Sequence, residues 1–363
     1  MDTRIKEKLS PFHLAILIYM TQTGMVIFSL SRLLAEHFGT NGWLAVPLVS
    51  LIVCANILLI AIVYRLGKGK SIFDIMEQSI PKLILFPVYL SLLLVWALLG
   101  CLVAKQYLLV FQMIAFPTTN PMLFKLVFDF LAFSLIIKGI YNISKAAAVF
   151  FWSIIGMAFL LFYFFYDFKW ERLTPFIFQD SAINVQGFTS VYLAFLGFEL
   201  SLLLFPYINN KTKLTKSVLA ANLLITFMYA YLAFISFGFY GHHYLKTLQF
   251  PLLSMFAYIQ FPFVQGTEIL FYGFFMFSII ITSVMYLWAA KETCVRIIPV
   301  NGNLIAAAII LFSYFVAYIP DVMSVLDKWL SILGQVEFGI AFGLPIFLIV
   351  LLLLQRMRGE RSE

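Results

Sequence analysis

The chain has 363 residues, of which 63% are hydrophobic and 11% are charged, and its formal net charge is +7. A soluble domain carries roughly 45–50% apolar and about 25% charged residues, so this composition excludes an ordinary soluble protein and indicates that lipid surrounds most of the chain. The basic residues lie between apolar runs and form no compact patch, which is typical of membrane-protein loops and argues against a nucleic-acid partner.

Apolar runs, interrupted by charges, Pro and Gly, predict about ten transmembrane helices, because a hydrocarbon core of about 30 Å needs roughly 20 apolar residues per helix. The predicted spans are 11–35, 43–64, 82–111, 121–138, 144–166, 187–207, 214–241, 267–290, 301–319 and 336–355. We therefore expect an all-α, multi-pass integral membrane protein.

Lys and Arg gather in alternate links between these spans. The charged N-terminal segment, the link 65–81, the link that contains YINNKTK and the C-terminal RMRGER all fall on one side if the span count is even. Positive charge collects on the cytoplasmic side of membrane proteins, so we expect both termini to be cytoplasmic.

Loop lengths divide the spans into two sets of five. In each set a longer link with a short helix-like piece follows the second span: SIFDIMEQS in 65–81 and PLLSMFAYIQF in 242–266. Five is odd, so the second set must enter the membrane from the opposite side, as in the 5+5 inverted repeat of many secondary transporters. The predicted units are a first repeat (1–166), an outer connecting segment (167–186) and a second repeat with a short basic cytoplasmic tail (187–363).

The first span of the chain, 11–35, is interrupted near its middle by Thr21, Gln22, Thr23 and Gly24. Thr hydroxyls compete for backbone carbonyls, and Gly has no Cβ to resist unwinding. Irregular backbone inside lipid is tolerated only beside a cavity, where freed N–H groups can bind a carboxylate. The alternative is that these small residues form a helix-packing surface.

The matching span of the second half, 187–207, carries Gly197, Glu199 and Ser201 near its middle and Pro206 near its end. A carboxylate at mid-membrane depth costs several kcal/mol unless it is neutralised, paired or hydrated, so we expect Glu199 to face the bundle interior. It could also be purely structural, hydrogen-bonded to a neighbouring helix. Breaks in corresponding spans of the two halves predict a shared midplane site.

The TQTG break (21–24), the segment FLGFELSLLLFPYI (195–208) and the ten-span layout resemble the B subunits of bacterial spore germinant receptors. Those proteins belong to the amino acid–polyamine–organocation transporter superfamily. The resemblance implies a LeuT-like fold with broken helices 1 and 6, in a bacterial cell membrane or spore inner membrane. It also implies A-type and C-type receptor subunits as partners and a small nutrient, such as an amino acid, as ligand.

Carried over by position, the resemblance implies ligand contacts from both breaks: Thr21, Gln22, Thr23 and Gly24 in span 1, and Gly197, Phe198 and Glu199 in span 6. One departure concerns carboxylate binding. Transporters of the superfamily often have a Gly-rich unwound segment in helix 1. In this chain Gly24 is the only glycine of that segment, and Gln22 lies close to it.

Three further polar residues lie inside apolar runs. Thr282 and Ser283 are the right types for a cation site shared with span 1, although such hydroxyls also bond the carbonyl one turn back in their own helix. Lys105 either extends to the interface or faces the cavity as a counter-charge to Glu199 or a ligand carboxylate.

We expect no metal site and no cofactor. His242 and His243 are adjacent on a predicted outer loop, and two ligands are too few for a metal ion. The sequence contains no phosphate-cradling loop, nucleophile elbow or zinc-ligand spacing, so we do not expect an enzyme.

Our leading hypothesis is a transporter-fold subunit of a germinant receptor, in which a nutrient bound between the breaks shifts the protein toward a signalling state. Two alternatives remain open. One is a proton-coupled amino-acid symporter that uses Glu199 as the proton carrier, and the other is a scaffold whose pocket binds nothing.

Overall fold

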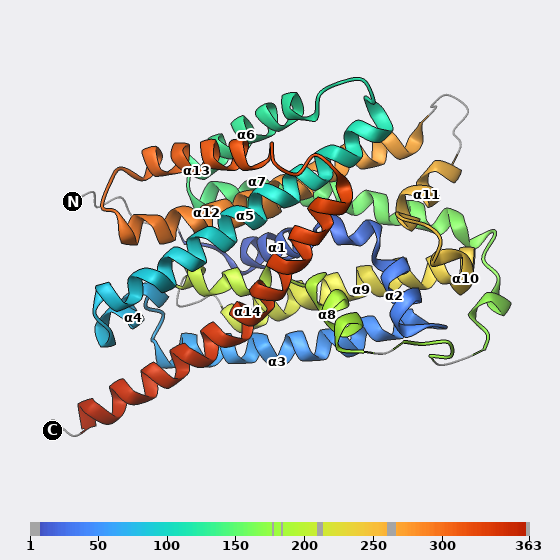
Figure 1. The fold of residues 1–363 in the computed structure, drawn as a ribbon. Coiled ribbons are helices and arrows are strands. Elements are labelled where there is room, and N and C mark those ends of the chain that lie inside the picture. Colours follow the sequence, from blue (N-terminus) through green and yellow to red (C-terminus); the bar gives the residue numbers. More distant parts are fainter. Residues whose placement is uncertain (1–7, 176–177, 183, 209–212, 260–265, 361–363) are drawn as a thin grey trace.

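A computed structural model describes residues 8–175, 178–182, 184–208, 213–259 and 266–360. Within these ranges the chain is built from helices (Figure 1). The α-helices are α1 (Pro11–Gln22), α2 (Leu30–Phe38), α3 (Ala45–Leu66), α4 (Ile72–Ser79), α5 (Lys82–Ala115), α6 (Pro121–Ile137), α7 (Ile140–Ala158), α8 (Val185–Leu193), α9 (Leu214–Tyr240), α10 (His242–Leu245), α11 (Pro251–Tyr258), α12 (Thr267–Ile297), α13 (Gly302–Val316) and α14 (Met323–Glu360). The 3₁₀ segments are η1 (Met25–Phe28), η2 (Gly42–Leu44), η3 (Phe159–Phe165), η4 (Trp170–Leu173) and η5 (Phe198–Tyr207).

Every predicted span falls mainly on residues that are helical in the structure. Among the described residues, six helices are long and apolar enough to cross a membrane alone, and α8 with η5 makes a seventh as a bent pair. The others fall short by length: the predicted span 11–35 is divided among α1, η1 and α2, while α6 has 17 residues and α13 has 15. The prediction of an all-α, multi-pass membrane protein is confirmed.

Large apolar side chains cover the outside of the bundle. Leu83 is 86% exposed, and Phe130 and Trp152 are about two-thirds exposed. A soluble protein rarely exposes so many large apolar groups together, whereas lipid is their natural solvent. The helix in the interior is α1, whose residues Leu14 to Gln22 are mostly buried, as expected for a helix that is apolar on all sides.

Two long helices, α5 and α12, pack closely against each other. Gly100 of α5 makes this possible, because a Cβ at that position would lie 2.9 Å from the Ser283 carbonyl oxygen and 2.8 Å from Leu287. Small residues that let two backbones approach are the usual basis of helix packing in membranes. These two helices form a rigid wall behind the break in the first span.

The two ends of the bundle differ, and we name them after the short helices that mark them (Figure 1). At the α4 end, Arg296 of α12 pairs with Asp74 at 2.7 Å, and Gln355 of α14 donates to the Ile75 carbonyl at 3.0 Å. The α10 end carries α2, α10 and α11. The two helix-like pieces predicted in the long links are thus confirmed as α4 and α11, at opposite ends of the bundle.

The described part of the chain begins and ends at the same end of the bundle. The Leu9 N–H donates to the Tyr207 carbonyl at 2.9 Å, and Tyr207 bonds Glu292 near the end of α12, so the start of the described chain lies at the α4 end with the last turns of α14. This geometry is what an even number of crossings requires. The cytoplasmic side of the termini, and the repeat boundaries 1–166, 167–186 and 187–363, stay predictions.

Candidate ligand-binding site

The two interrupted spans cross each other at their breaks. Helix α1 ends at Gln22, and the chain passes through Thr23 and Gly24 into η1. Helix α8 ends at Leu193, and η5 follows after a turn, with the two axes bent by about 40°. Gly197, at the end of that turn, has φ +118°, and a Cβ on it would lie 2.9 Å from the Thr21 carbonyl group. The two breaks therefore touch through backbone atoms.

Hydroxyl groups of α12 satisfy the carbonyls that the first break sets free. Ser278 donates to the Thr23 carbonyl at 2.9 Å. The Thr282 hydroxyl lies 3.1 Å from the Met20 carbonyl oxygen and 3.2 Å from that of Thr21. A backbone carbonyl left unpaired in lipid costs several kcal/mol, so α12 supplies what the interrupted helix lacks.

Helix α9 ties the two breaks together. The Tyr229 hydroxyl lies 3.0 Å from the Gln22 carbonyl oxygen and 3.1 Å from that of Ala194. The Gln22 side chain in turn donates to the Phe195 carbonyl at 2.8 Å and lies 3.3 Å from the Asn222 amide oxygen. Both breaks are thus fixed by specific hydrogen bonds and not merely unwound.

Replacing Tyr229 with Phe is expected to lower the free energy of unfolding by about 1–3 kcal/mol, because the single hydroxyl proton that the buried Gln22 and Ala194 carbonyls share is lost. Thermal unfolding of the purified protein in detergent measures the change. Tyr231→Phe is the matched control on the same helix, since the Tyr231 hydroxyl is buried with no hydrogen-bond partner in the described chain. Equal effects of the two substitutions would contradict the role given to Tyr229.

A cavity of about 300 Å³ lies beside the crossing breaks and extends toward the α10 end. Its deep part is lined by groups of the first break and of α12: Thr21, Gln22, Gly24, Thr282 and Tyr286. Nearer the α10 end it is lined by Arg32 of α2, Gln106 of α5 and Asp327 of α14, together with Gln249 and Phe250 before α11. The cavity therefore combines polar groups of the first break and α12 with one cationic and one anionic side chain nearer the α10 end.

The structure brings some of the predicted span-1 residues to this cavity and turns others away. Thr21, Gln22 and Gly24 line it, whereas Thr23 donates to the Tyr19 carbonyl at 2.8 Å and borders a separate apolar cavity. Of the predicted cation-site pair, Thr282 lines the cavity. Ser283 donates instead to the Gly100 carbonyl of α5 at 2.7 Å, which points it away from the break.

The predicted span-6 residues lie behind the cavity floor. Glu199 is 2% exposed and folds back on its own helix start, where it accepts from the Gly197 N–H at 2.7 Å. Its other oxygen accepts from the Tyr286 hydroxyl at 3.0 Å, and Tyr286 lines the cavity. Phe198 is fully buried and packs edge-on against Tyr192. Glu199 is therefore connected to the cavity through Tyr286.

A second buried carboxyl, which the sequence analysis missed, adjoins Glu199. Glu337 of α14 is fully buried, and the Trp96 indole donates to its Oε1 at 3.0 Å. Its carboxyl lies near that of Glu199, and its Oε2 has no hydrogen-bond partner among the described residues. The predicted span 336–355 placed Glu337 at a helix margin, but α14 begins at Met323, so Glu337 lies well inside the bundle.

A family model described as "Spore germination protein" matches residues 8–324 of the chain. The chain belongs to this family. Relatives include the spore germination protein GerQB of Bacillus cereus, 26% identical over 97% of this chain and 96% of its own length. Spore germination protein B2 of Bacillus subtilis (strain 168) is 26% identical over 71% of this chain and 70% of its own length.

Solved transporter structures share the fold of this spore germination family member. The nucleobase-cation-symport-1 transporter Mhp1, closed with bromovinylhydantoin bound, superposes with a TM-score of 0.65 at 15% identity, over 96% of this chain and 79% of Mhp1. A substrate-bound, outward-open Na⁺-coupled sialic acid symporter gives a TM-score of 0.65 at 14% identity, over 94% and 79%. The predicted fold, a LeuT-like transporter architecture with broken helices 1 and 6, is confirmed.

The remaining predicted residue, Lys105, lies elsewhere in this family member. Its side chain is fully buried, its Nζ lies 3.4 Å from the Met122 sulfur, and it lines a separate cavity with Asn120 and Asp321. The structure therefore brings Lys105 neither to Glu199 nor to the cavity at the breaks. This cavity lies among residues of the links that follow α5 and α13.

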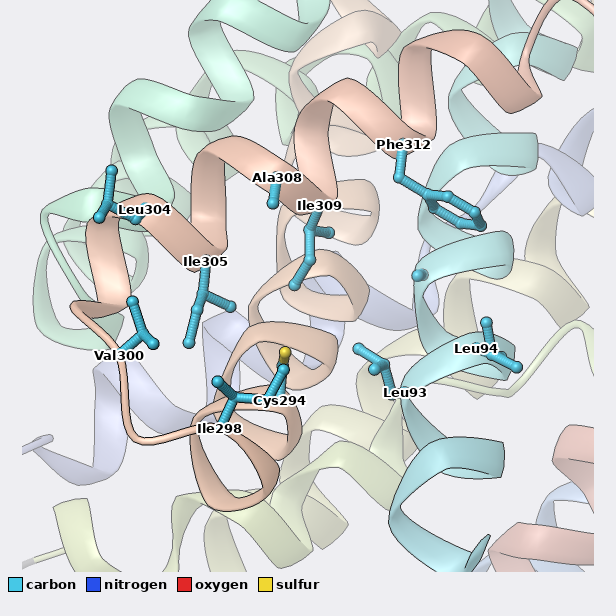
Figure 2. A pocket seen from close by; sticks show the side chains of 11 residues that line it. Leu93, Leu94, Cys294, Ile298, Val300, Leu304, Ile305, Ala308, Ile309 and Phe312 are labelled. Carbon is cyan, nitrogen blue, oxygen red and sulfur yellow. The ribbon is translucent and has the colours of Figure 1, made fainter. Parts of the chain in front are cut away.

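A groove of about 440 Å³ between α5, α12 and α13 is larger than the cavity at the breaks but has a different chemistry (Figure 2). Its lining consists of aliphatic side chains, one phenylalanine and the Cys294 thiol. Such a surface suits a hydrocarbon chain and offers nothing to orient a polar nutrient. The candidate ligand site is therefore the cavity at the breaks.

Proposed function

We propose that this protein is the transporter-fold subunit of a spore germinant receptor and that it binds a free amino acid in the cavity at the breaks. The observation that carries the proposal is the arrangement of charge along that cavity. Arg32 and Asp327 face it from different helices, and the polar floor is formed by Gln22, Thr282 and Tyr286. A zwitterion carries one charge of each sign and so matches this lining.

The two charged side chains retain capacity to bind a ligand. Arg32 pairs with Glu36 at 3.1 Å through one terminal nitrogen, while its Nε is buried without a partner among the described residues. Asp327 accepts from the Gln106 amide at 2.7 Å, which leaves its second oxygen for a ligand ammonium. Hydrogen bonds between oppositely charged groups are the strong ones, especially where water is scarce.

A ligand in this position would contact α1, α2, α12 and α14 at once. Binding can shift a conformational equilibrium only by the difference in affinity between two states, and a ligand held between separate helices has such a difference whenever those helices move. We propose that this shift is passed to A-type and C-type receptor subunits, the partners that the family resemblance implies.

Arg32→Gln is expected to weaken amino-acid binding by about ten- to a hundredfold, because a charge-assisted bond to the ligand carboxylate is lost. It should not weaken binding of the decarboxylated amine of the same ligand. Asp327→Asn should have the converse effect: it should weaken binding of the amino acid but not binding of its deaminated acid. Ligand-dependent thermal stabilisation of the purified protein, with a panel of proteinogenic L-amino acids and these analogues, measures all of these affinities.

Lys328→Gln is the control, since Lys328 neighbours Asp327 on α14 but does not line the cavity. The same variants are to be scored for the amino-acid dose that triggers germination of spores. The proposal fails if the purified protein binds no amino acid and the spore response is unchanged by Arg32→Gln and Asp327→Asn.

The pair Glu199 and Glu337 favours a second candidate, a proton-coupled amino-acid symporter. Two carboxyls in contact at this depth provide a place for an exchangeable proton, and Tyr286 connects it to the cavity. A symporter accumulates labelled amino acid in proteoliposomes against its gradient when a pH gradient is imposed, without partner subunits. A receptor subunit binds the amino acid in the same vesicles and does not accumulate it.

A further inference from the structure

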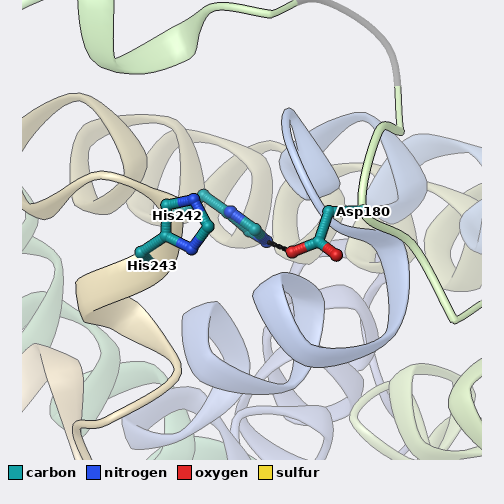
Figure 3. Close-up of side chains that lie close together, drawn as sticks. All are labelled: Asp180, His242 and His243. Carbon is teal, nitrogen blue, oxygen red and sulfur yellow. Dashed lines mark ion pairs between the residues drawn. The ribbon is translucent and has the colours of Figure 1, made fainter.

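Two adjacent histidines meet a carboxylate that is distant from them in the sequence, at the α10 end (Figure 3). His242 and His243 open α10, and Asp180 belongs to the segment that precedes α8. One potential ligand atom from each lies within 4.8 Å of the others, and the His242 Nε2 lies 3.7 Å from the Asp180 Oδ2. The sequence places two potential ligands in tandem, and the fold supplies the third.

His242 is the residue of this cluster whose ring nitrogen lacks a hydrogen-bond partner among the described residues. Its side chain is 5% exposed, and its Nε2 is buried with no hydrogen-bond partner in the described part of the chain. That nitrogen points at the Asp180 carboxylate (Figure 3). Burying a ring nitrogen without a partner costs free energy, and a bound cation between it and the carboxylate would remove that cost.

We propose that Asp180, His242 and His243 form a Zn²⁺ site. Two imidazole nitrogens and one carboxylate oxygen are ligands that zinc prefers, and three protein ligands with one open position are a known arrangement around it. Bonds of about 2.0–2.1 Å in tetrahedral geometry place ligand atoms about 3.3 Å apart. The 3.7 Å between His242 and Asp180 is close to that separation, and His243 needs only a side-chain rotation on an exposed position.

Lys246 competes with the metal for one of its ligands. Its Nζ lies 3.0 Å from the Asp180 Oδ2 and is partly exposed, so it can swing into solvent when a divalent ion binds. Its charge also repels a cation at this distance. The proposal therefore makes a prediction that a purely structural ion pair does not make: removing the Lys246 charge strengthens metal binding.

Binding of the metal would cross-link the segment before α8 to the start of α10. Gln249 and Phe250, which line the ligand cavity, follow α10 closely in the chain. The site thus lies where an ion would restrain both the segment that joins the predicted repeats and the chain beside the cavity. It is distinct from the amino-acid site and does not depend on it.

The test uses the full chain purified in detergent without a polyhistidine tag, titrated with Co²⁺ and then with Zn²⁺. We expect one Co²⁺ per chain with the visible d–d absorption of a tetrahedral ion, displaced by Zn²⁺. Asp180→Asn and His243→Ala should each weaken binding by at least about tenfold. Lys246→Met should tighten it severalfold, and His13→Ala, at the opposite end of the bundle, should leave it unchanged.

His243 and Lys246 are partly or fully exposed, so their substitution should leave the fold intact, which far-ultraviolet circular dichroism and gel filtration check. The proposal is overturned if Co²⁺ shows no tetrahedral spectrum in the wild-type protein. It is also overturned if His243→Ala binds as tightly as His13→Ala, or if Lys246→Met weakens the binding.

Discussion

Gly197→Ala is expected to destabilise the protein by about 2–6 kcal/mol and to abolish amino-acid binding. The backbone at Gly197 has φ +118°, where a residue with a Cβ is strained by about 1–3 kcal/mol. The added methyl group would also lie 2.9 Å from the carbonyl carbon and oxygen of Thr21. These are backbone atoms held by Thr282, so they cannot yield as a flexible side chain would, and overpacking adds about 1–3 kcal/mol.

Gly24→Ala is the matched control in the other break. Gly24 has φ −96°, which any residue adopts, and a Cβ there would have no atom within 4 Å. We expect this substitution to leave the unfolding temperature within the error of the measurement. Thermal unfolding of the two variants in detergent decides the matter. If Gly24→Ala is as damaging as Gly197→Ala, the crossing of the breaks is not what holds the site.

The spans and both breaks could be predicted from the sequence because their signals are local. Apolar runs of membrane length and a polar interruption within a run are each read within one helix. The sequence also identified Gly24 and Gly197 as places where a helix can break, but it could not rank them. That ranking depends on which backbone lies opposite each glycine, and the Thr21 carbonyl that excludes a Cβ at Gly197 is 176 positions away in the chain.

The side of a helix that faces a cavity could not be predicted, because it depends on how the helix is rotated among its neighbours. Thr21 and Thr23 are two positions apart, so they point to different sides of α1, and the cavity takes Thr21. For the same reason Lys105 was a plausible counter-charge to Glu199 on the sequence alone. In the fold its side of α5 faces α6, where it meets Met122.

Glu337 shows a different limit of the sequence analysis. A carboxyl near the end of an apolar run reads as an interfacial residue, and the run itself suggested that the helix began there. Helix α14 extends more than three turns further because residues 323–335, although more polar, face the ligand cavity through Asp327, Ser331 and Gly334. When one end of a membrane helix lines a cavity with polar residues, the apolar run in its sequence is shorter than the helix itself.

Substituting Gln for both Glu199 and Glu337 is expected to abolish the pH dependence of amino-acid binding without unfolding the protein. Two negative charges this close together and away from water repel each other, and a proton bound by the pair relieves that repulsion. Among the described residues no Lys or Arg side chain interacts with either carboxyl, which leaves the proton as their means of neutralisation. Gln has the shape of a protonated Glu and can still accept from Trp96 and Tyr286.

The proton is linked to the ligand through Tyr286, which lines the cavity and donates to Glu199. A ligand that alters this hydrogen bond changes how tightly the pair holds its proton, and by reciprocity pH then changes the ligand's affinity. One linked proton alters Kd by up to about tenfold per pH unit. We therefore expect a sloping plot of Kd against pH for the wild-type protein, a flat one for the double variant, and an unchanged slope for Glu268→Gln, which lies outside the pair. A wild-type plot that is already flat, or a double variant that keeps the slope, would show that Glu199 and Glu337 serve only to join η5 to α14.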